Sequence, residues 1–239
     1  GITHLACTPH IYPGVYPNSV ATIEPAMRQL QAALDAEGIP LQLVMGADVH
    51  MVHDVLQGLQ EGGIPTLNGS RYVLLEPAHR LPVPRFLAHI ETLLDAGFVP
   101  VITHPERLDW FATHYWDFIE AVRLGAWLQV TAGAICGDFG QQARRNAMRL
   151  LQAGVVHILA SDAHGADFRP PILSSGVAAA LDLLGDAQEV RRMVYDRPQV
   201  ILSNAGPARV PVPVESLGVP TQYWGYRVEN GWLGHRVIG

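Results

Sequence analysis

Short apolar runs that end in histidine or a carboxylate recur along the chain, and this repetition constrains the fold more than any other feature. In the clearest case, His157-Ile-Leu-Ala-Ser-Asp-Ala-His164, an apolar run ends in Asp162 and His164. Four other runs end in the same way, at His10, Asp48, Glu76 and His104. Apolar runs of this length are typical of buried strands. The pattern therefore predicts core strands whose far ends carry metal-type ligands.

Helical segments alternate with these strands. Segments with apolar residues at helical spacing end at glycine before the next strand, at Gly38, Gly97, Gly125 and Gly154. We expect the strands that follow at residues 41–45, 98–103, 126–131 and 155–160. Alternating helices and strands favour an α/β fold with parallel strands, either a barrel or an open doubly wound sheet. In both architectures functional groups gather at the carboxyl ends of the strands, so the predicted ligands should converge.

The chain divides in character near Ser203. A length of 239 residues with 49% hydrophobic content is enough for one large core, and we assign residues 1–203 to one catalytic domain. Residues 204–239 form a Pro/Gly-rich tail in which Asn230-Gly231 separates two short segments, Tyr226–Glu229 and Trp232–Ile238. This dipeptide favours a C-terminal hairpin, and a disordered tail is the alternative.

Charge and motifs exclude several classes of protein. The net charge is −6 and no basic stripe is present, which disfavours a nucleic-acid partner. Only Cys7 and Cys136 occur, without an export signal or an apolar run of transmembrane length, so we expect a cytoplasmic protein without a disulfide. The chain has no Cys-x5-Arg loop, no Gly-x-Ser-x-Gly elbow and no Walker loop.

The remaining polar residues indicate metal-dependent phosphate chemistry. Histidine with aspartate and glutamate suits manganese, iron, magnesium or zinc, and the guanidinium groups of Arg107 and Arg169 match phosphate oxygens. We therefore predict a metal-dependent hydrolase of phosphate esters. Alternatives remain for single residues, because Glu76 could pair with an arginine and Asp48 could cap a helix that carries His50 and His53 on its surface.

Other residues have less specific interpretations. His4 and His157 fall within predicted strands and are expected in the core or behind the ligands. Four histidines are expected at the surface: His79, His89, His114 and His235. Four aromatic residues follow ligand-bearing strands and could flank an aromatic substrate, although core or surface packing is commoner for each alone: Tyr12, Tyr16, Trp110 and Phe111.

An ordered set of motifs carries a family resemblance. The motifs are Thr8-Pro-His10, Gly46-Ala-Asp48, Leu74-Leu-Glu76, Thr103-His-Pro-Glu-Arg107, Gln129-Val-Thr-Ala-Gly133, Ala160-Ser-Asp-Ala-His164 and Arg169-Pro-Pro171. Over most of residues 1–203 the chain resembles the polymerase and histidinol phosphatase (PHP) superfamily. Within that superfamily it resembles the bacterial manganese-dependent tyrosine-protein phosphatases linked to capsule and exopolysaccharide synthesis.

The resemblance implies a distorted (β/α)7-type barrel of parallel strands with up to three metal ions, manganese in the first instance. It implies six ligands: His10, Asp48, Glu76, His104, Asp162 and His164. It also implies that Arg107 and Arg169 hold the phosphoryl group of phosphotyrosine, on a protein such as a tyrosine autokinase, during attack by a metal-activated water. The alternatives are a small-molecule phosphatase resembling histidinol phosphatase and a non-catalytic metal-binding module. The sequence leaves the oligomeric state open, including a homo-oligomer.

The chain departs from the family pattern in two places. The position of Asp48 is often glutamate in relatives, and the family's amino-terminal His-x-His motif has no counterpart. Because Gly1-Ile-Thr-His-Leu-Ala has the form of a helix-ending glycine followed by a strand, we expect a first helix and strand to be missing. We therefore expect an unpaired barrel edge, an incomplete metal cluster and little phosphatase activity from residues 1–239 alone.

Overall fold

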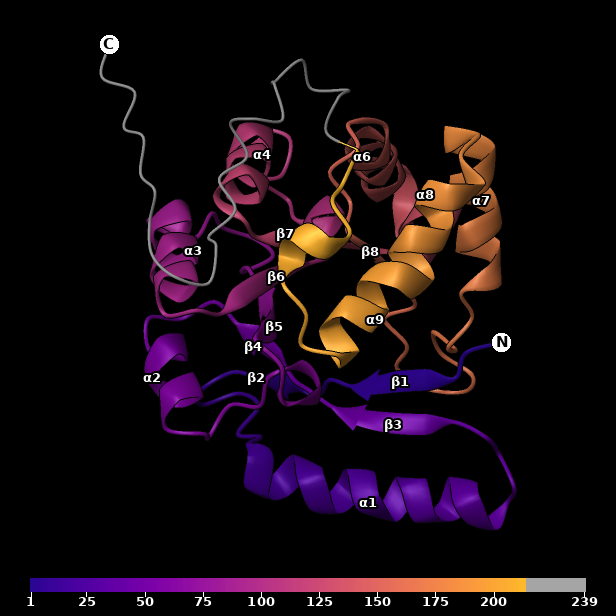
Figure 1. The fold of residues 1–239 in the computed structure, drawn as a ribbon. Helices are drawn as coiled ribbons and strands as arrows, with labels where there is room; N and C mark the ends of the chain where they lie inside the picture. Colours follow the sequence, from indigo (N-terminus) through magenta and orange to yellow (C-terminus); the bar gives the residue numbers. More distant parts are fainter. Residues whose placement is uncertain (214–239) are drawn as a thin grey trace.

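Parallel strands form the framework that carries the predicted ligands (Figure 1). The structure, a computed structural model, describes residues 1–213. Six strands pair in chain order, each parallel to its neighbours: β2 (His10–Ile11), β4 (Asp48–His50), β5 (Tyr72–Glu76), β6 (Val99–Thr103), β7 (Trp127–Thr131) and β8 (Ile158–Ala160). The predicted parallel α/β architecture is confirmed. Within residues 1–213, β2 and β8 do not pair with each other, so the sheet is open between them.

Two of the apolar runs that end in predicted ligands, at His10 and Asp48, are each divided into two strands. β1 (His4–Cys7) pairs with β3 (Gln42–Met45) in a separate two-stranded sheet, and β2 and β4 follow after breaks of two residues. Pro9 lies in the first break and cannot donate a ladder hydrogen bond. Gly46 lies in the second, where an added Cβ would lie 2.8 Å from a side-chain carbon of Leu67. Close packing at Gly46 and the proline therefore interrupt the two strands at the same level.

The helices lie between or beyond the strands as predicted. They are α1 (Val20–Ala36), α2 (Val55–Gln60), α3 (Phe86–Asp95), α4 (Tyr115–Leu124), α5 (Ala132–Cys136), α6 (Gly140–Gln152), α7 (Ser174–Leu184), α8 (Ala187–Arg191) and α9 (Arg197–Leu202). All four predicted helix-ending glycines have positive φ, from 67° at Gly38 to 117° at Gly125, a conformation that glycine adopts at low cost. Within residues 1–213, no helix combines the length and the apolar composition needed to cross a bilayer.

A continuous apolar core lies between the sheet and its helices. Trp110 and Phe111 belong to this core, where their rings pack 5.3 Å and 5.5 Å from the ring of Phe118. Packing, rather than contact with a substrate, therefore accounts for these two aromatic residues. By contrast, α1 lies along β3 at one side of the molecule (Figure 1), and its Leu30 is 50% exposed.

The last described residues pack against the body of the protein. The Tyr72 hydroxyl donates a hydrogen bond of 2.8 Å to the Ala205 carbonyl, and Val212 is buried. α8 continues through a π-helical segment, Arg192–Asp196, into α9, whose first residue is the fully buried Arg197. The predicted hairpin at 226–238 lies outside the described residues.

The histidines outside the ligand-bearing strand ends have mixed environments. His157 is buried as predicted: its Nδ1 accepts a hydrogen bond from the Leu128 amide, and burial lowers its pKa, with the Arg197 charge adding to the effect. His4 is exposed in β1, so its predicted place in the core is wrong. His89 and His114 are half-buried, whereas His235 lies outside the described residues.

Candidate metal centre

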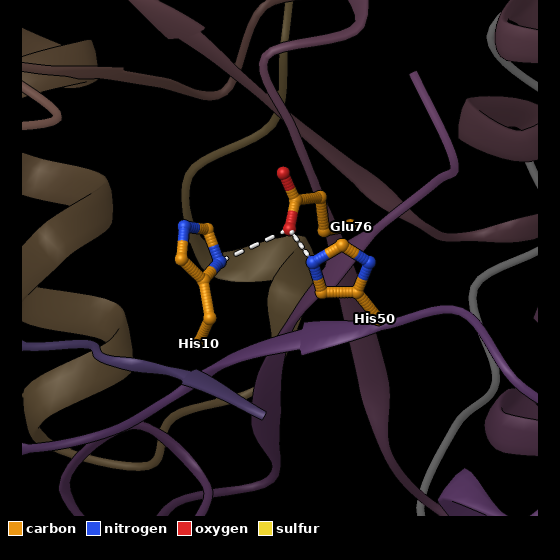
Figure 2. Close-up of side chains that lie close together, drawn as sticks. All are labelled: His10, His50 and Glu76. Carbon is orange, nitrogen blue, oxygen red and sulfur yellow. Dashed lines mark ion pairs between the residues drawn. The ribbon is translucent and has the colours of Figure 1, made fainter. Parts of the chain in front are cut away.

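The carboxylate of Glu76 lies among four imidazole rings at the carboxyl ends of adjacent strands. In the sheet register, His10 on β2 is paired with Asp48 on β4, and His50 on β4 is paired with Glu76 on β5. Figure 2 shows His10 and His50 approaching the Glu76 carboxylate from two sides. Parallel strands of matched register therefore bring residues that are far apart in the chain to one place.

Each Glu76 oxygen faces its own pair of histidines. Oε2 lies 2.6 Å from His50 Nε2 and 3.1 Å from His10 Nδ1. Oε1 lies 3.1 Å from His79 Nε2 and 3.4 Å from His104 Nε2. Glu76 is 3% exposed, so this carboxylate is shielded from water, and its charge requires close partners.

Asp48 is the second carboxylate of the cluster. Its Oδ2 lies 3.6 Å from His10 Nδ1 and 3.7 Å from His104 Nε2, while its Oδ1 accepts a hydrogen bond of 3.2 Å from Thr103. The alternative that Asp48 caps a helix is wrong, because β4 continues to His50 and α2 begins only at Val55. Asp48 thus lies between the two histidine pairs.

The electrostatics of the cluster favour an ionised carboxylate. Burial by itself would raise the pKa of Glu76, but contacts with His10, His50 and His79 and the nearby charge of His104 outweigh it and lower that pKa. The pKa of His10 is raised, mainly by Glu76, although burial opposes the shift. A centre that draws positive charge to Glu76 in this way also suits a metal cation.

Two histidines of the cluster were left out of the site predicted from the sequence. The alternative that His50 lies on a helix surface is wrong, because His50 lies in β4 two residues after Asp48, and alternate residues of a strand share a face. His79 was expected at the surface; its side chain is 36% exposed, but in the loop after β5 it contacts Glu76, and its ring lies 5.1 Å from that of His104 at an interplanar angle of 44°. The Asp-x-His spacing was the available indication for His50. His53 does lie at the surface, with 90% of its side chain exposed.

Asp162 and His164 lie beside the cluster and contact the two arginines. Asp162 forms ion pairs with Arg107 and with Arg169, and His164 contacts the Arg169 guanidinium. The His164 ring is 6.2 Å from that of His10, which places this arginine group next to the Glu76 cluster. Within residues 1–213, neither Asp162 nor His164 belongs to a group of three potential ligands within reach of one ion.

Aromatic rings pack against both the arginine pair and the histidines of the Glu76 cluster. The guanidinium carbons of Arg107 and Arg169 lie 4.4 Å and 5.5 Å from the ring centre of Phe139, within the range of cation–π contact. Tyr12 stacks on His50 at 4.2 Å with an interplanar angle of 8°, and Tyr16 stacks on His10 at 5.3 Å. Both tyrosines are more than a third exposed. They therefore form an accessible aromatic wall beside the cluster.

The donor set fits a metal ion. Glu76 Oε2 and His10 Nδ1 are buried without a hydrogen bond, although they lie 3.1 Å apart. Two donors that each bind one ion at about 2.1 Å are roughly 3 Å apart at a right angle. Lone pairs that face each other at this spacing require a proton or a metal cation between them, and imidazole with carboxylate suits divalent first-row metals.

Comparison with known proteins places these features in a family. Residues 1–203 match the family described as "Capsular polysaccharide synthesis, CpsB/CapC". Over 171 residues the chain is 35% identical to the tyrosine-protein phosphatase YwqE of Bacillus subtilis, a match that covers 71% of this chain and 66% of YwqE. It is 26% identical over 207 residues to the tyrosine-protein phosphatase CpsB of Streptococcus pneumoniae, and this match covers 84% of this chain and 85% of CpsB.

The fold has a solved counterpart. It superposes with a TM-score of 0.81 and 29% identity on a chain from the crystal structures of YwqE from Bacillus subtilis and CpsB from Streptococcus pneumoniae. The match covers 89% of this chain and 84% of that one. Those two proteins are described as unique metal-dependent tyrosine phosphatases.

Proposed function

This chain belongs to the CpsB/CapC family of capsular polysaccharide synthesis proteins, and from that premise we propose that it is a metal-dependent protein-tyrosine phosphatase. Membership confirms the family expected from the sequence motifs. The observation that carries the proposal is the position of the Glu76 cluster beside Arg107 and Arg169. The Glu76 cluster offers metal ligands, and the two arginines offer guanidinium groups for phosphate.

We propose manganese as the metal and the six residues implied by the family as its ligands: His10, Asp48, Glu76, His104, Asp162 and His164. The first four already share the cluster, and Asp162 and His164 lie next to it. A divalent ion bound there would lower the pKa of water and offset charge on phosphate.

The arginine pair acts on the phosphoryl group. Asp162 holds the two guanidinium groups together, while the Phe139 ring lies within cation–π distance of both. This arrangement fixes their orientation before a ligand arrives, and a planar guanidinium can donate two hydrogen bonds to neighbouring phosphate oxygens. The pair therefore positions the phosphate and stabilises charge as the ester bond breaks.

The tyrosine wall suits the organic part of the substrate. Tyr12 and Tyr16 cover the outer faces of His50 and His10 and remain accessible, so they can pack against a phenyl ring. A phenolate leaving group, with a free pKa of about 10, needs less protonation than an alkoxide. Phosphotyrosine therefore requires fewer catalytic groups here than phosphoserine would.

We extend the proposal to the physiological setting. Capsule-synthesis membership favours a tyrosine autokinase of the same pathway as the phosphotyrosine protein. The two cysteines, Cys7 and Cys136, are free thiols, which suits a reducing compartment such as the cytoplasm.

Substrate comparison tests the proposed function. The purified chain is assayed with Mn²⁺ on a phosphotyrosine peptide, a phosphoserine peptide and histidinol phosphate, before and after chelation. We expect turnover to need added metal, to be slow for residues 1–239 alone, and to be fastest with the phosphotyrosine peptide. A preference for histidinol phosphate would instead support a small-molecule phosphatase, and no metal-dependent turnover of any ester by the full-length protein would contradict the enzyme assignment.

Substitution of Arg107 tests the phosphate-binding role. We expect Arg107→Ala to slow phosphotyrosine hydrolysis by about 100- to 1,000-fold, the loss of about 2.7–4 kcal/mol typical of a preorganised electrostatic donor. Arg107→Lys keeps the charge without the planar guanidinium, so its rate should lie between those of the unmodified chain and Arg107→Ala. Bound metal, measured by elemental analysis, should stay unchanged in both variants.

The matched control is Arg123→Ala on α4, which removes an arginine from a half-exposed ion pair with Glu120. That variant should keep the normal rate, because Arg123 lies outside the cluster. Equal rates for Arg107→Ala and Arg123→Ala would remove Arg107 from the site.

A further inference from the structure

We propose that His50 and His79 are metal ligands and that Glu76 bridges two ions through its two oxygens. This inference rests on the proposed function for the presence of metal, but it concerns two residues outside the ligand set expected from the sequence. The first ion would bind to His10, His50 and Glu76, and the second to Glu76, His79 and His104. In each group the potential ligand atoms all lie within 4.8 Å of one another.

The first group is drawn in Figure 2. The nitrogens of His10 and His50 converge on the same oxygen, Oε2, at 3.1 Å and 2.6 Å. That oxygen and His10 Nδ1 are buried and make no hydrogen bond. Stacking on Tyr12 keeps the plane of the His50 ring directed at the carboxylate. Both nitrogens thus approach one oxygen, and the three atoms are close enough together to share an ion.

The second group uses the other oxygen. Oε1 lies 3.1 Å from His79 Nε2 and 3.4 Å from His104 Nε2, and the two rings lie 5.1 Å apart. The backbone holds His79 in place, because its carbonyl accepts a hydrogen bond of 3.0 Å from the Asp109 amide. His104 is held by its position at the end of β6 and is 3% exposed. The second oxygen therefore has a separate pair of nitrogens.

Four imidazole rings and two carboxylates, Glu76 and Asp48, share one largely buried space. Neutral imidazoles can direct lone pairs at a shared ion without repelling one another. Asp48 lies within 3.7 Å of one histidine from each group, so its charge offsets that of either ion.

The ligand type determines the class of ion. Each group offers two imidazole nitrogens and one carboxylate oxygen, which suit manganese, iron, cobalt or zinc better than magnesium or calcium. We therefore expect both ions to be first-row transition metals. Magnesium should not compete with manganese at equal concentration.

Metal stoichiometry tests the inference directly. Full-length chain, stripped with chelator, is titrated with Mn²⁺ by calorimetry, and bound metal is counted by elemental analysis. We expect at least two ions per chain. His50→Ala and His79→Ala should each weaken one ion by at least about 100-fold, because losing even a residue that only supports a ligand costs up to that factor. In each variant the other ion should remain.

The control is His53→Ala, which removes an exposed histidine three residues from His50. It should bind metal as the unmodified chain does. Far-ultraviolet circular dichroism checks folding, and His50→Gln and His79→Gln provide variants of similar size if an alanine variant fails to fold. Unchanged stoichiometry and affinity in folded His50 and His79 variants would overturn the inference.

The outcomes separate this inference from the proposed function. Metal-dependent phosphatase activity with unaffected metal binding in both histidine variants would leave the function intact and exclude His50 and His79. Two ions lost one at a time, without phosphatase activity on any ester, would support the bridged pair and contradict the enzyme assignment. Fewer than two ions in the unmodified chain would exclude the bridged pair, whatever the activity.

Discussion

Replacing Arg197 with alanine is expected to destabilise the protein by about 3–5 kcal/mol, the usual cost of leaving a buried charge without its partner. Arg197 is fully buried, and its Nη2 lies 2.8 Å from Oε1 of Glu189, which is itself 2% exposed. The guanidinium also donates to the backbone carbonyls of four residues, at distances from 2.7 to 3.3 Å: Val156, His157, Val210 and Pro211. The substitution therefore leaves Glu189 Oε1 and several carbonyls without the Arg197 donor, while Glu189 Oε2 keeps its ion pair with Arg192.

The same contacts explain why the effect should be global. Arg197 joins α9 to the residues just before β8 and to the last described part of the chain. Urea unfolding monitored by circular dichroism gives the free energy of unfolding. The matched control is Arg192→Ala. Arg192 pairs with the same Glu189 at 3.2 Å, but its side chain is 35% exposed, so this substitution should lower the free energy of unfolding by less than about 1 kcal/mol. A similar loss in both variants would show that burial of the Arg197 pair has no special weight.

The sequence predicted the elements that depend on local patterns. The strand Tyr72–Glu76 and the end of the strand at Thr103 were located correctly, because apolar runs and turn glycines are local features. Convergence of His10, Asp48, Glu76 and His104 was also predictable, since parallel strands share one carboxyl end. The packing role of Trp110 and Phe111 was one of two interpretations that the sequence left open.

What the sequence missed depends on register and on loop conformation. His50 enters the site because β4 extends two residues beyond Asp48 and pairs His50 with Glu76. His79 enters because the loop after β5 turns back toward that strand's end. Neither fact follows from periodicity, and a polar histidine after a strand is usually exposed. The buried position of Arg197 could not be predicted either, because its partners lie up to 41 residues away in the chain.

Asp162 and His164 differ from the other expected ligands because they lie in the loop after β8 and contact arginines. Asp162 and Arg169 both have positive φ, 49° and 52°, in the loop after β8. That conformation is uncommon for residues other than glycine, and it directs Asp162 toward the arginines. The sequence placed both residues near the site correctly, but it could not indicate that their contacts would be with guanidinium groups.

Replacing Glu76 with glutamine is expected to produce the largest loss of function, because this one carboxylate is shared by both histidine pairs. The substitution keeps the size of the side chain but removes its charge, so the chain should fold normally and bind neither ion tightly. Phosphotyrosine hydrolysis should fall by at least about 1,000-fold, which corresponds to about 4 kcal/mol of transition-state stabilisation. Elemental analysis and steady-state kinetics with added Mn²⁺ measure the two effects on the same preparation.

Other single-residue variants distinguish the loss of one ion from the loss of both. Glu91→Gln, a charge-removing substitution on an exposed position of α3, serves as the matched control and should change neither quantity. His50→Ala and His79→Ala should each lose one ion, whereas Glu76→Gln should lose both, because Glu76 contacts all four histidines. Retention of one tightly bound ion in Glu76→Gln would show that Asp48 or the Asp162–His164 group holds that ion without the bridge. Retention of both ions together with normal turnover would place the metal centre elsewhere in the protein.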